Sequence, residues 1–393
     1  MLKTRTMLAA AAMFMAPVGL SQTVAGDIDA EIIDGHLFIY GDDDDSSISI
    51  TSTSQYSITV AGQTTTSGES TFVNGEENGT VVLNGWTRGI FVYNYGGDDA
   101  VDMQNLTSAG PVTIDQGLGD DQVMIGTNEI NESLLGLSGG DADALILDGS
   151  TVTLNSYLLI ITSDGADDVM IRNTTVARTM TVDLGAGDDY FMAGGGEIVQ
   201  AMFGNNSYIV PGIGADEIEL QGVTFERNLV IDDATGPLTL NVMDTEVAES
   251  SFVYATPDND EIMASNWNMG DFLLMITESG DDTISYSGDS ADATFYTNAG
   301  NDRVELYDIE SGNIIVQMAT GDDRVWLSNS MLNRFDLYGS ADNDFFKVRS
   351  TTASEGYIYG ASGTDTVQES TLFPNAIGTY REYSIENNTS SVR

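Results

Sequence analysis

The stretch Gly117-Leu118-Gly119-Asp120-Asp121-Gln122-Val123 decides the fold of this chain, because its pattern returns at regular intervals. Close copies occupy residues 185–191 and 212–218. Alignment on the second Asp of the motif gives thirteen anchor positions separated by steps of 20 to 27 residues, most often 22. Such a period is typical of solenoids, whose coils stack only on their neighbours. The anchors are Asp99, Asp121, Asp143, Asp167, Asp189, Asp216, Leu238, Asp260, Asp282, Asp302, Asp323, Asp344 and Asp365.

Three apolar columns accompany the anchors. The residue two positions after the anchor is apolar in all thirteen repeats, from Val101 to Val367. A second column lies seven positions before the anchor, where only Gly136 interrupts it, and a weaker third column lies nine positions after it. Apolar residues also alternate with period two, as expected for strands. We therefore predict an all-β fold: a right-handed parallel β-helix (β-solenoid) of about 13 three-sided coils of ~22 residues, with capping strands.

The corners of the predicted coils have their own pattern. Ten repeats carry Asn, Asp or Gly six positions after the anchor. These residue types tolerate a left-handed backbone, which a sharp turn between strands often requires. The ten residues are Asn105, Gly149, Asn173, Gly195, Gly222, Asp244, Asn266, Gly288, Asp308 and Asn329.

The two ends of the chain differ from the repeats. Residues 1–25 combine a basic start, an apolar run and small residues, which predicts a signal peptide and a secreted or cell-surface protein. We assign residues 26–90 to an N-terminal β cap and 91–368 to the parallel β-solenoid. Residues 369–393 form the predicted C-terminal cap or tail, since a stack of coils needs a cover at each open end.

The charge of the chain limits its partners. Without residues 1–25 it has 11 basic and 61 acidic residues, a net charge of −50. Such a protein repels nucleic acid and anionic membranes and attracts divalent cations. No later stretch has the length and hydrophobicity of a membrane span, and the chain has no cysteine. We therefore expect no nucleic-acid partner, no membrane span and no disulfides.

The G-x-G-x-D-x-apolar motif resembles the hemolysin-type calcium-binding (RTX) repeat. The resemblance covers one turn per coil and implies calcium held by Asp carboxylates, although the motif returns every 22 residues rather than every nine. Stacked carboxylates about 4.8 Å apart also favour a divalent cation with oxygen ligands. The candidate metal ligands are Asp98, Asp99, Asp120, Asp121, Asp141, Asp143, Asp167, Asp188, Asp189, Asp216, Asp260, Asp281, Asp282, Asp302, Asp322 and Asp323.

A second interpretation uses the same residues without metal. Asp and Gly are good turn formers, and an Asp side chain can accept hydrogen bonds from nearby backbone. The sequence alone leaves both interpretations open.

Two functional hypotheses follow. The regular coils, which leave little room for a residue-rich groove, favour a non-enzymatic surface or matrix protein that binds calcium and an extracellular glycan or another surface protein. The alternative is a β-helix carbohydrate-active enzyme, a polysaccharide lyase or hydrolase, in which Arg303 and Arg324 would lie beside the carboxylates. For these two arginines, ordinary charge pairing is the simpler interpretation. We assign no catalytic residue, and the only histidine is His36.

Overall fold

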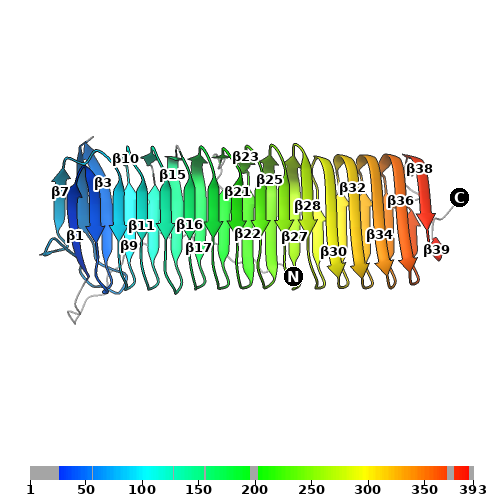
Figure 1. The fold of residues 1–393 in the computed structure, drawn as a ribbon, viewed down its shortest axis with the longest axis horizontal. Coiled ribbons are helices and arrows are strands. Elements are labelled where there is room, and N and C mark those ends of the chain that lie inside the picture. Colours follow the sequence, from blue (N-terminus) through cyan, green and yellow to red (C-terminus); the bar gives the residue numbers. More distant parts are fainter. Residues whose placement is uncertain are drawn as a thin grey trace.

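The computed structural model describes residues 26–388, except positions 55, 127, 155, 195–201 and 370–375. The described chain forms a long rod of stacked strands (Figure 1), and none of its residues is helical. The thirteen anchors enclose twelve successive turns, which confirms the predicted parallel β-solenoid with a repeat of about 22 residues. The predicted signal peptide and the corner residue Gly195 lie outside the described residues.

One long sheet contains the strands that follow the anchors. Neighbouring strands in it are parallel and in register, so that Val101 lies opposite Val123 and Val304 opposite Val325. Side chains at equivalent positions of successive coils therefore stack on one another. These strands are β9 (Ala100–Gln104), β12 (Gln122–Gly126), β15 (Ala144–Leu154), β17 (Asp168–Val176), β19 (Tyr190–Gly194), β22 (Asp216–Gln221), β25 (Leu238–Val247), β27 (Glu261–Met269), β29 (Thr283–Tyr286), β31 (Arg303–Tyr307), β33 (Arg324–Ser328), β35 (Phe345–Arg349) and β37 (Thr366–Glu369).

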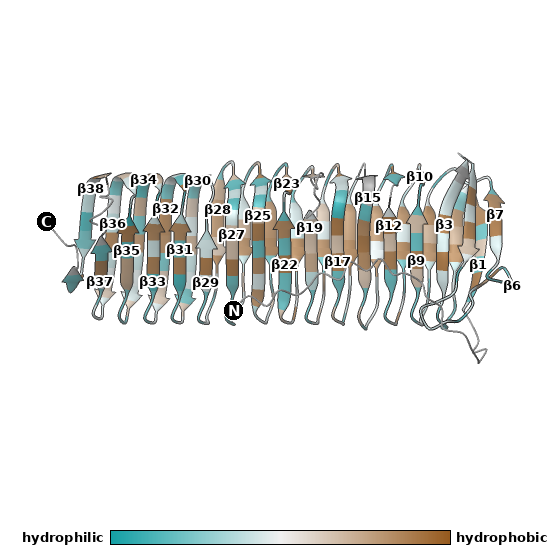
Figure 2. Cartoon of the chain, turned by 180° about the vertical axis from the view of Figure 1, so that it is seen from behind, coloured by the Kyte–Doolittle hydropathy of each residue, from teal (hydrophilic) through white to brown (hydrophobic). Residues whose placement is uncertain are grey.

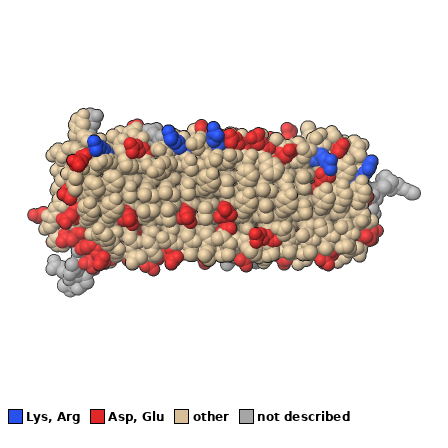
Figure 3. Space-filling view, viewed as in Figure 1, with Lys and Arg blue, Asp and Glu red and all other residues tan. Residues whose placement is uncertain are grey.

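The strands that precede the anchors form the opposite sheet. Its outward face carries many apolar and aromatic side chains, while most of the acidic residues in view lie along the two edges of this face (Figure 3). The strands are β8 (Ile90–Tyr93), β11 (Val112–Asp115), β14 (Leu134–Leu137), β16 (Leu158–Ile161), β18 (Met180–Asp183), β21 (Ser207–Val210), β24 (Leu229–Asp232), β26 (Ser251–Tyr254), β28 (Phe272–Ile276), β30 (Ser290–Ala299), β32 (Glu310–Thr320), β34 (Met331–Ala341), β36 (Thr352–Ser362) and β38 (Ala376–Tyr383).

The third side of the coil changes its connection along the rod. In the first coils it is a separate short strand, namely β10 (Thr107–Ser108), β13 (Glu129–Ile130), β20 (Met202–Phe203) or β23 (Thr224–Phe225), or the end of a long post-anchor strand such as β27. From β30 onward it is the beginning of the pre-anchor strand instead. The column nine positions after the anchor remains largely inside, as Phe225 and Leu332 show.

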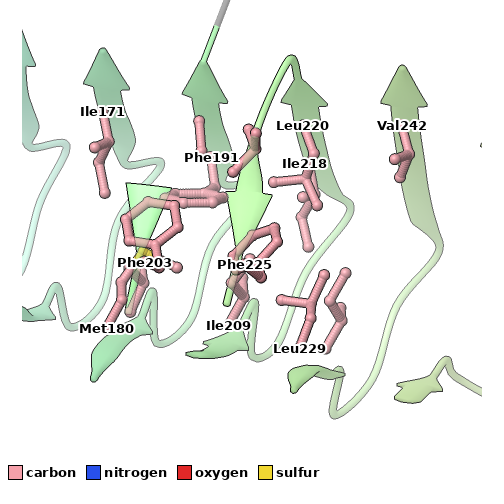
Figure 4. Close-up of a cluster of buried hydrophobic side chains, with 14 of the residues drawn as sticks. Ile171, Met180, Phe191, Phe203, Ile209, Ile218, Leu220, Phe225, Leu229 and Val242 are labelled. Carbon is pink, nitrogen blue, oxygen red and sulfur yellow. The ribbon is translucent and has the colours of Figure 1, made fainter. Parts of the chain in front are cut away.

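The interior of the rod consists of the predicted apolar columns. Phe191, Ile209 and Phe225 are fully buried and belong to three different sides of the coil. Figure 4 shows them in one continuous cluster, in which the Phe203 and Phe225 rings stack with centroids 5.1 Å apart. Burial of each large apolar side chain contributes about 1.5–3 kcal/mol, so stacking supplies the core that one coil lacks.

The predicted corners adopt the left-handed backbone conformation. The φ angle is 56° at Asn105, 50° at Asp244 and 50° at Asn329. Positive φ also occurs at the predicted corner residues Asn173, Gly222, Asn266, Gly288 and Asp308.

The N-terminal strands add antiparallel pairs to the first coil. β3 (Ser47–Ser54) and β4 (Ser57–Gly62) form a hairpin, and β4 also pairs with β7 (Thr80–Asn84). The remaining strands of this end are β1 (Asp27–Ile33), β2 (His36–Tyr40), β5 (Phe72–Val73) and β6 (Glu76–Glu77).

Parallel stacking continues into both predicted end segments. β2 pairs with β8 and β3 pairs with β9, so residues 36–54 form one more coil at the N-terminal end. At the other end β38 pairs with β36, and β39 (Asn387–Asn388) pairs with β37. Among the described residues, no helix has the length and hydrophobicity needed to cross a membrane.

Candidate functional site

The anchor aspartates form a buried ladder along one corner of the rod. Asp121, Asp167 and Asp323 have at most 3% of their surface exposed, and the other anchor aspartates are buried as well. In eleven of the thirteen anchors, the Oδ1 atom accepts a hydrogen bond from the backbone N–H of the anchor in the preceding coil, over 2.8 to 3.1 Å. The carboxylates therefore tie each coil to the previous one, which explains why Asp recurs at this position.

The coil of Leu238 shows how the chain compensates for a missing carboxylate. The backbone N–H of Asp216 there donates to the carbonyl oxygen of Pro237 instead, at 3.1 Å. Asp233 places a buried carboxylate in the same coil, and its pKa is raised to about 7 by burial and by the charge of Asp216. The sequence gives a weak signal for Asp233, because it lies outside the repeating motif.

The ladder extends one step beyond the periodic anchors at each end. Ser46 donates both its backbone N–H and its hydroxyl to Asp99 Oδ1, at 2.8 and 2.6 Å. The backbone N–H of Asp365 donates to Glu386 Oε2, at 2.9 Å. Ser46 and Glu386 occupy the anchor position of the terminal coils, and the repeat pattern misses both because neither is an Asp at the expected spacing.

The second oxygen of most anchors has no hydrogen-bond partner among the described residues. This Oδ2 atom is buried, and in several coils it lies near the residue five positions before the anchor. At that position the buried hydroxyls of Thr277 and Thr297 lie beside the carboxyl groups of Asp282 and Asp302 and act against the rise of their pKa values. The anchors with such an oxygen are Asp99, Asp121, Asp143, Asp167, Asp189, Asp216, Asp282, Asp302, Asp323, Asp344 and Asp365.

Burial raises the pKa values of these carboxyl groups. Desolvation is the largest cause and raises the pKa of Asp121 and Asp323 from 3.8 to about 8, although the backbone hydrogen bond acts in the opposite direction. In Asp282 the pKa rises to about 6, because the nearby Thr277 hydroxyl further limits the shift. The charges of neighbouring anchors raise these pKa values too. A proton or a cation would relieve the cost of burying this row of charge.

A second ladder runs along the outside of the same corner. The exposed residue one position before the anchor accepts a backbone N–H from the following coil: Asp98 Oδ1 from Asp120, over 3.1 Å, and Asp281 Oδ1 from Asn301, over 2.8 Å. Asn259, Asn301 and Asn343 take the same place with an amide oxygen. The two ladders therefore have opposite polarity, since the inner one accepts from the preceding coil.

The predicted metal ligands divide between these two ladders. Ten of them are buried anchors: Asp99, Asp121, Asp143, Asp167, Asp189, Asp216, Asp260, Asp282, Asp302 and Asp323. Five are exposed outer residues: Asp98, Asp120, Asp188, Asp281 and Asp322. Asp141 is an exposed corner residue with a φ of 94°. Within the described ranges no three acidic or histidine side chains form a group that could hold a metal ion.

The glycine before the anchor is required by the neighbouring coil as well as by the turn. Gly187 and Gly300 have φ values of 155° and 146°. A Cβ atom added to Gly300 would lie 1.6 Å from the carbonyl oxygen of Gly280, and one on Gly187 would meet Gly165 at 1.3 Å. No side chain fits there without moving the backbone, so glycine allows adjacent corners to approach closely.

The two arginines predicted beside the carboxylates lie on the outer face of their strands. Arg303 pairs with Glu305, as the simpler interpretation predicted. Arg324 is exposed, whereas the side chains of Asp302 and Asp323 are buried at the inner corner.

Comparison with known proteins gives no relatives. No protein-family model matches the sequence, and no curated protein or solved structure matches the chain.

Proposed function

We propose that this protein is a non-enzymatic, secreted or cell-surface β-solenoid that serves in adhesion or in an extracellular matrix. One observation carries the proposal: the carboxylates of the repeated motif act coil after coil as acceptors for backbone N–H groups. The most regular polar feature of the chain thus has a structural use. Such a rod presents long side faces to a glycan or to another surface protein.

We further propose that divalent cations, calcium above all, associate with the carboxylate corner. The turn motif resembles the calcium-binding RTX repeat, and the exposed outer row includes Asp98, Asp120 and Asp281. A free carboxylate oxygen in most anchors and a net charge of −48 for the whole chain also favour cation uptake. Calcium accepts irregular sets of oxygen ligands, including carbonyl and amide oxygens.

Calcium titration at pH 8 tests this proposal. Isothermal titration calorimetry on the chelator-treated protein should detect binding, and the thermal unfolding midpoint should rise with free calcium because a ligand of the folded state stabilises it. Magnesium at the same ionic strength is the matched control for screening of surface charge. Equal midpoints in calcium, magnesium and chelator would reject the calcium part and leave a purely structural ladder.

The alternative, a carbohydrate-active enzyme, predicts a different readout. Incubation with a polysaccharide panel should then release new reducing ends or unsaturated products. The adhesion proposal predicts intact polysaccharide after prolonged incubation, and product formation that Arg324→Ala abolishes would overturn it.

A further inference from the structure

Basic residues gather at one place on this acidic molecule. Four of the 11 basic residues outside positions 1–25 lie on three adjacent strands, β31, β33 and β35, near the C-terminal end (Figure 2). They are Arg303, Arg324, Lys347 and Arg349, and together with Trp326 we call them the basic patch.

The register of the strands places Trp326 at the centre of the basic patch. Lys347 is its direct neighbour on the next strand, and Arg324 lies two residues before it on the same strand. The guanidinium carbon of Arg303 is 4.3 Å from the centroid of the indole, and Lys347 Nζ is 5.3 Å from it. Both cations are therefore held over the aromatic ring.

The basic patch carries more cations than carboxylates on its own three strands. Glu305 pairs with Arg303, and no ion pair is present for Arg324 or Lys347 among the described residues. The outward neighbours on the flanking strands are neutral: Thr283 and Ser285 before the patch, Thr366 and Gln368 after it. The outward side chains of β31, β33 and β35 thus include four cations and one carboxylate, Glu305, in a chain of net charge −48, and the exposed carboxylate of Asp322 interacts with Arg324 from the adjacent turn.

The surface is hollowed beside Trp326. A depression of about 410 Å³ is lined by Trp326, Ser328, Asn329, Lys347 and Arg349, together with Leu327 and Ser350. The indole Nε1 is shielded from solvent and has no hydrogen-bond partner within the described part of the chain. A shielded donor without an acceptor costs free energy, which a ligand oxygen would recover.

We propose that the basic patch binds an acidic glycan, recognising a sugar ring that carries a carboxylate or a sulfate. The cations supply donors for the anionic group, and the side-chain stems of Lys347 and Arg349 beside the indole supply apolar contact for the ring. The depression has the size of a small-molecule site. The inference rests on the proposed extracellular function, since it names the partner class that such a rod would hold.

The acidic rest of the molecule favours a glycan over nucleic acid. Affinity for nucleic acid depends on many phosphate contacts, and outside the basic patch this surface repels them. One or two acidic sugar units can engage four cations without extending over the acidic coils.

Calorimetry on the full chain at low salt tests the proposal. The probes are galacturonate oligosaccharides for the carboxylate, chondroitin sulfate oligosaccharides for the sulfate, neutral dextran oligosaccharides, and single-stranded oligothymidylate. We expect at least one acidic saccharide to bind more tightly than dextran and oligothymidylate. The double variant Lys347→Gln/Arg349→Gln should weaken it about tenfold or more, by about 1.4 kcal/mol. Trp326→Ala should also weaken it.

The double variant Arg178→Gln/Arg227→Gln is the matched control. It removes the same charge from exposed arginines elsewhere on the rod, and Trp326→Phe keeps an aromatic ring if Trp326→Ala does not fold. Equal weakening by control and patch variants, tighter oligothymidylate binding, or no binding of either acidic saccharide would overturn the proposal. Calcium-linked stability without glycan binding would leave the proposed function standing. Glycan cleavage would overturn the proposed function while binding at the basic patch persists.

Discussion

Asp282 shows what a single carboxylate does in the inner ladder. Its Oδ1 atom accepts the backbone N–H of Asp260 at 2.9 Å, and its Oδ2 atom is buried without a partner in the described chain. Asp282→Ala leaves that N–H buried and unpaired, so we expect it to lower the free energy of unfolding by about 1–3 kcal/mol. Asp282→Asn keeps an acceptor and removes the charge, and should unfold close to the wild type at pH 8.

Thermal unfolding by circular dichroism measures these changes. Asp281→Ala is the control, because its carboxylate is exposed and water replaces it, with an expected change within about 0.5 kcal/mol. If Asp282→Asn destabilises as much as Asp282→Ala, the negative charge itself is needed, which would favour a bound cation over a hydrogen-bond acceptor.

Among the corner elements, glycine has two separable uses. Gly222 has a φ of 64° with no atom within 4 Å of an added Cβ, whereas Gly300 combines a φ of 146° with backbone 1.6 Å from the Cβ position. Gly222→Ala should therefore cost about 1–2 kcal/mol for its left-handed backbone alone. Gly300→Ala should cost clearly more, because two coils must also separate.

The unfolding midpoints of these two variants provide the measurement, with wild-type protein in the same scan. Equal midpoints for Gly222→Ala and Gly300→Ala would show that glycine is required at these corners by the backbone conformation and not by the contact between coils.

The coils and corners were predictable because each strand repeats the same local rule. Val101 and Asn105 keep their spacing from the anchor in later coils, so periodicity alone identifies inward columns and left-handed turns. The terminal coils were not predictable in this way. Ser46 contacts Asp99 at a sequence separation of 53 positions, and Glu386 has a longer side chain than the anchors that it continues.

The sequence allowed us to predict where the aspartates of the candidate site lie in each coil, but not their burial or their hydrogen-bond partners. The sequence places Asp121 at a Gly-rich turn, where a solvated cation ligand and a backbone acceptor use the same residue type. Which of the two carboxylate oxygens of an anchor Asp faces inward depends on how closely the next coil packs against it. That packing is a property of the folded rod and cannot be inferred from one turn of the sequence. Asp233 and the arrangement around Trp326 likewise depend on neighbours in adjacent coils.

At the scale of the whole molecule, the buried ladder makes stability depend on pH. Burial raises the pKa values of Asp143 and Asp302 to about 6, of Asp99 and Asp344 to about 7 and of Asp323 to about 8, from 3.8. These groups bind protons more tightly when folded, so their stabilising effect is complete below about pH 4 and is lost as pH rises through 6 to 8. In the absence of divalent cations, we expect the thermal unfolding midpoint to be higher at pH 5 than at pH 8.

The pH series is best run with chelator and 0.5 M sodium chloride, because salt screens the exposed carboxylates and leaves the buried ones little affected. A thermal unfolding midpoint that is lower at pH 5 than at pH 8 would contradict the burial of uncompensated carboxyl groups. With calcium present, a falling midpoint is the expected sign of cations displaced by protons.

The opposite polarity of the two ladders has a consequence for how this rod can change its length. In each regular coil, one side-chain acceptor serves the preceding turn and one serves the following turn, with the same donors at the same offsets. A segment cut from one anchor to the next therefore leaves two ends that still match. Duplication or loss of such a segment changes the rod in increments of about 4.8 Å, the width of one strand. Because the hydrogen-bond pattern at the corner is the same from coil to coil, the length of the rod can evolve independently of the surfaces that it carries.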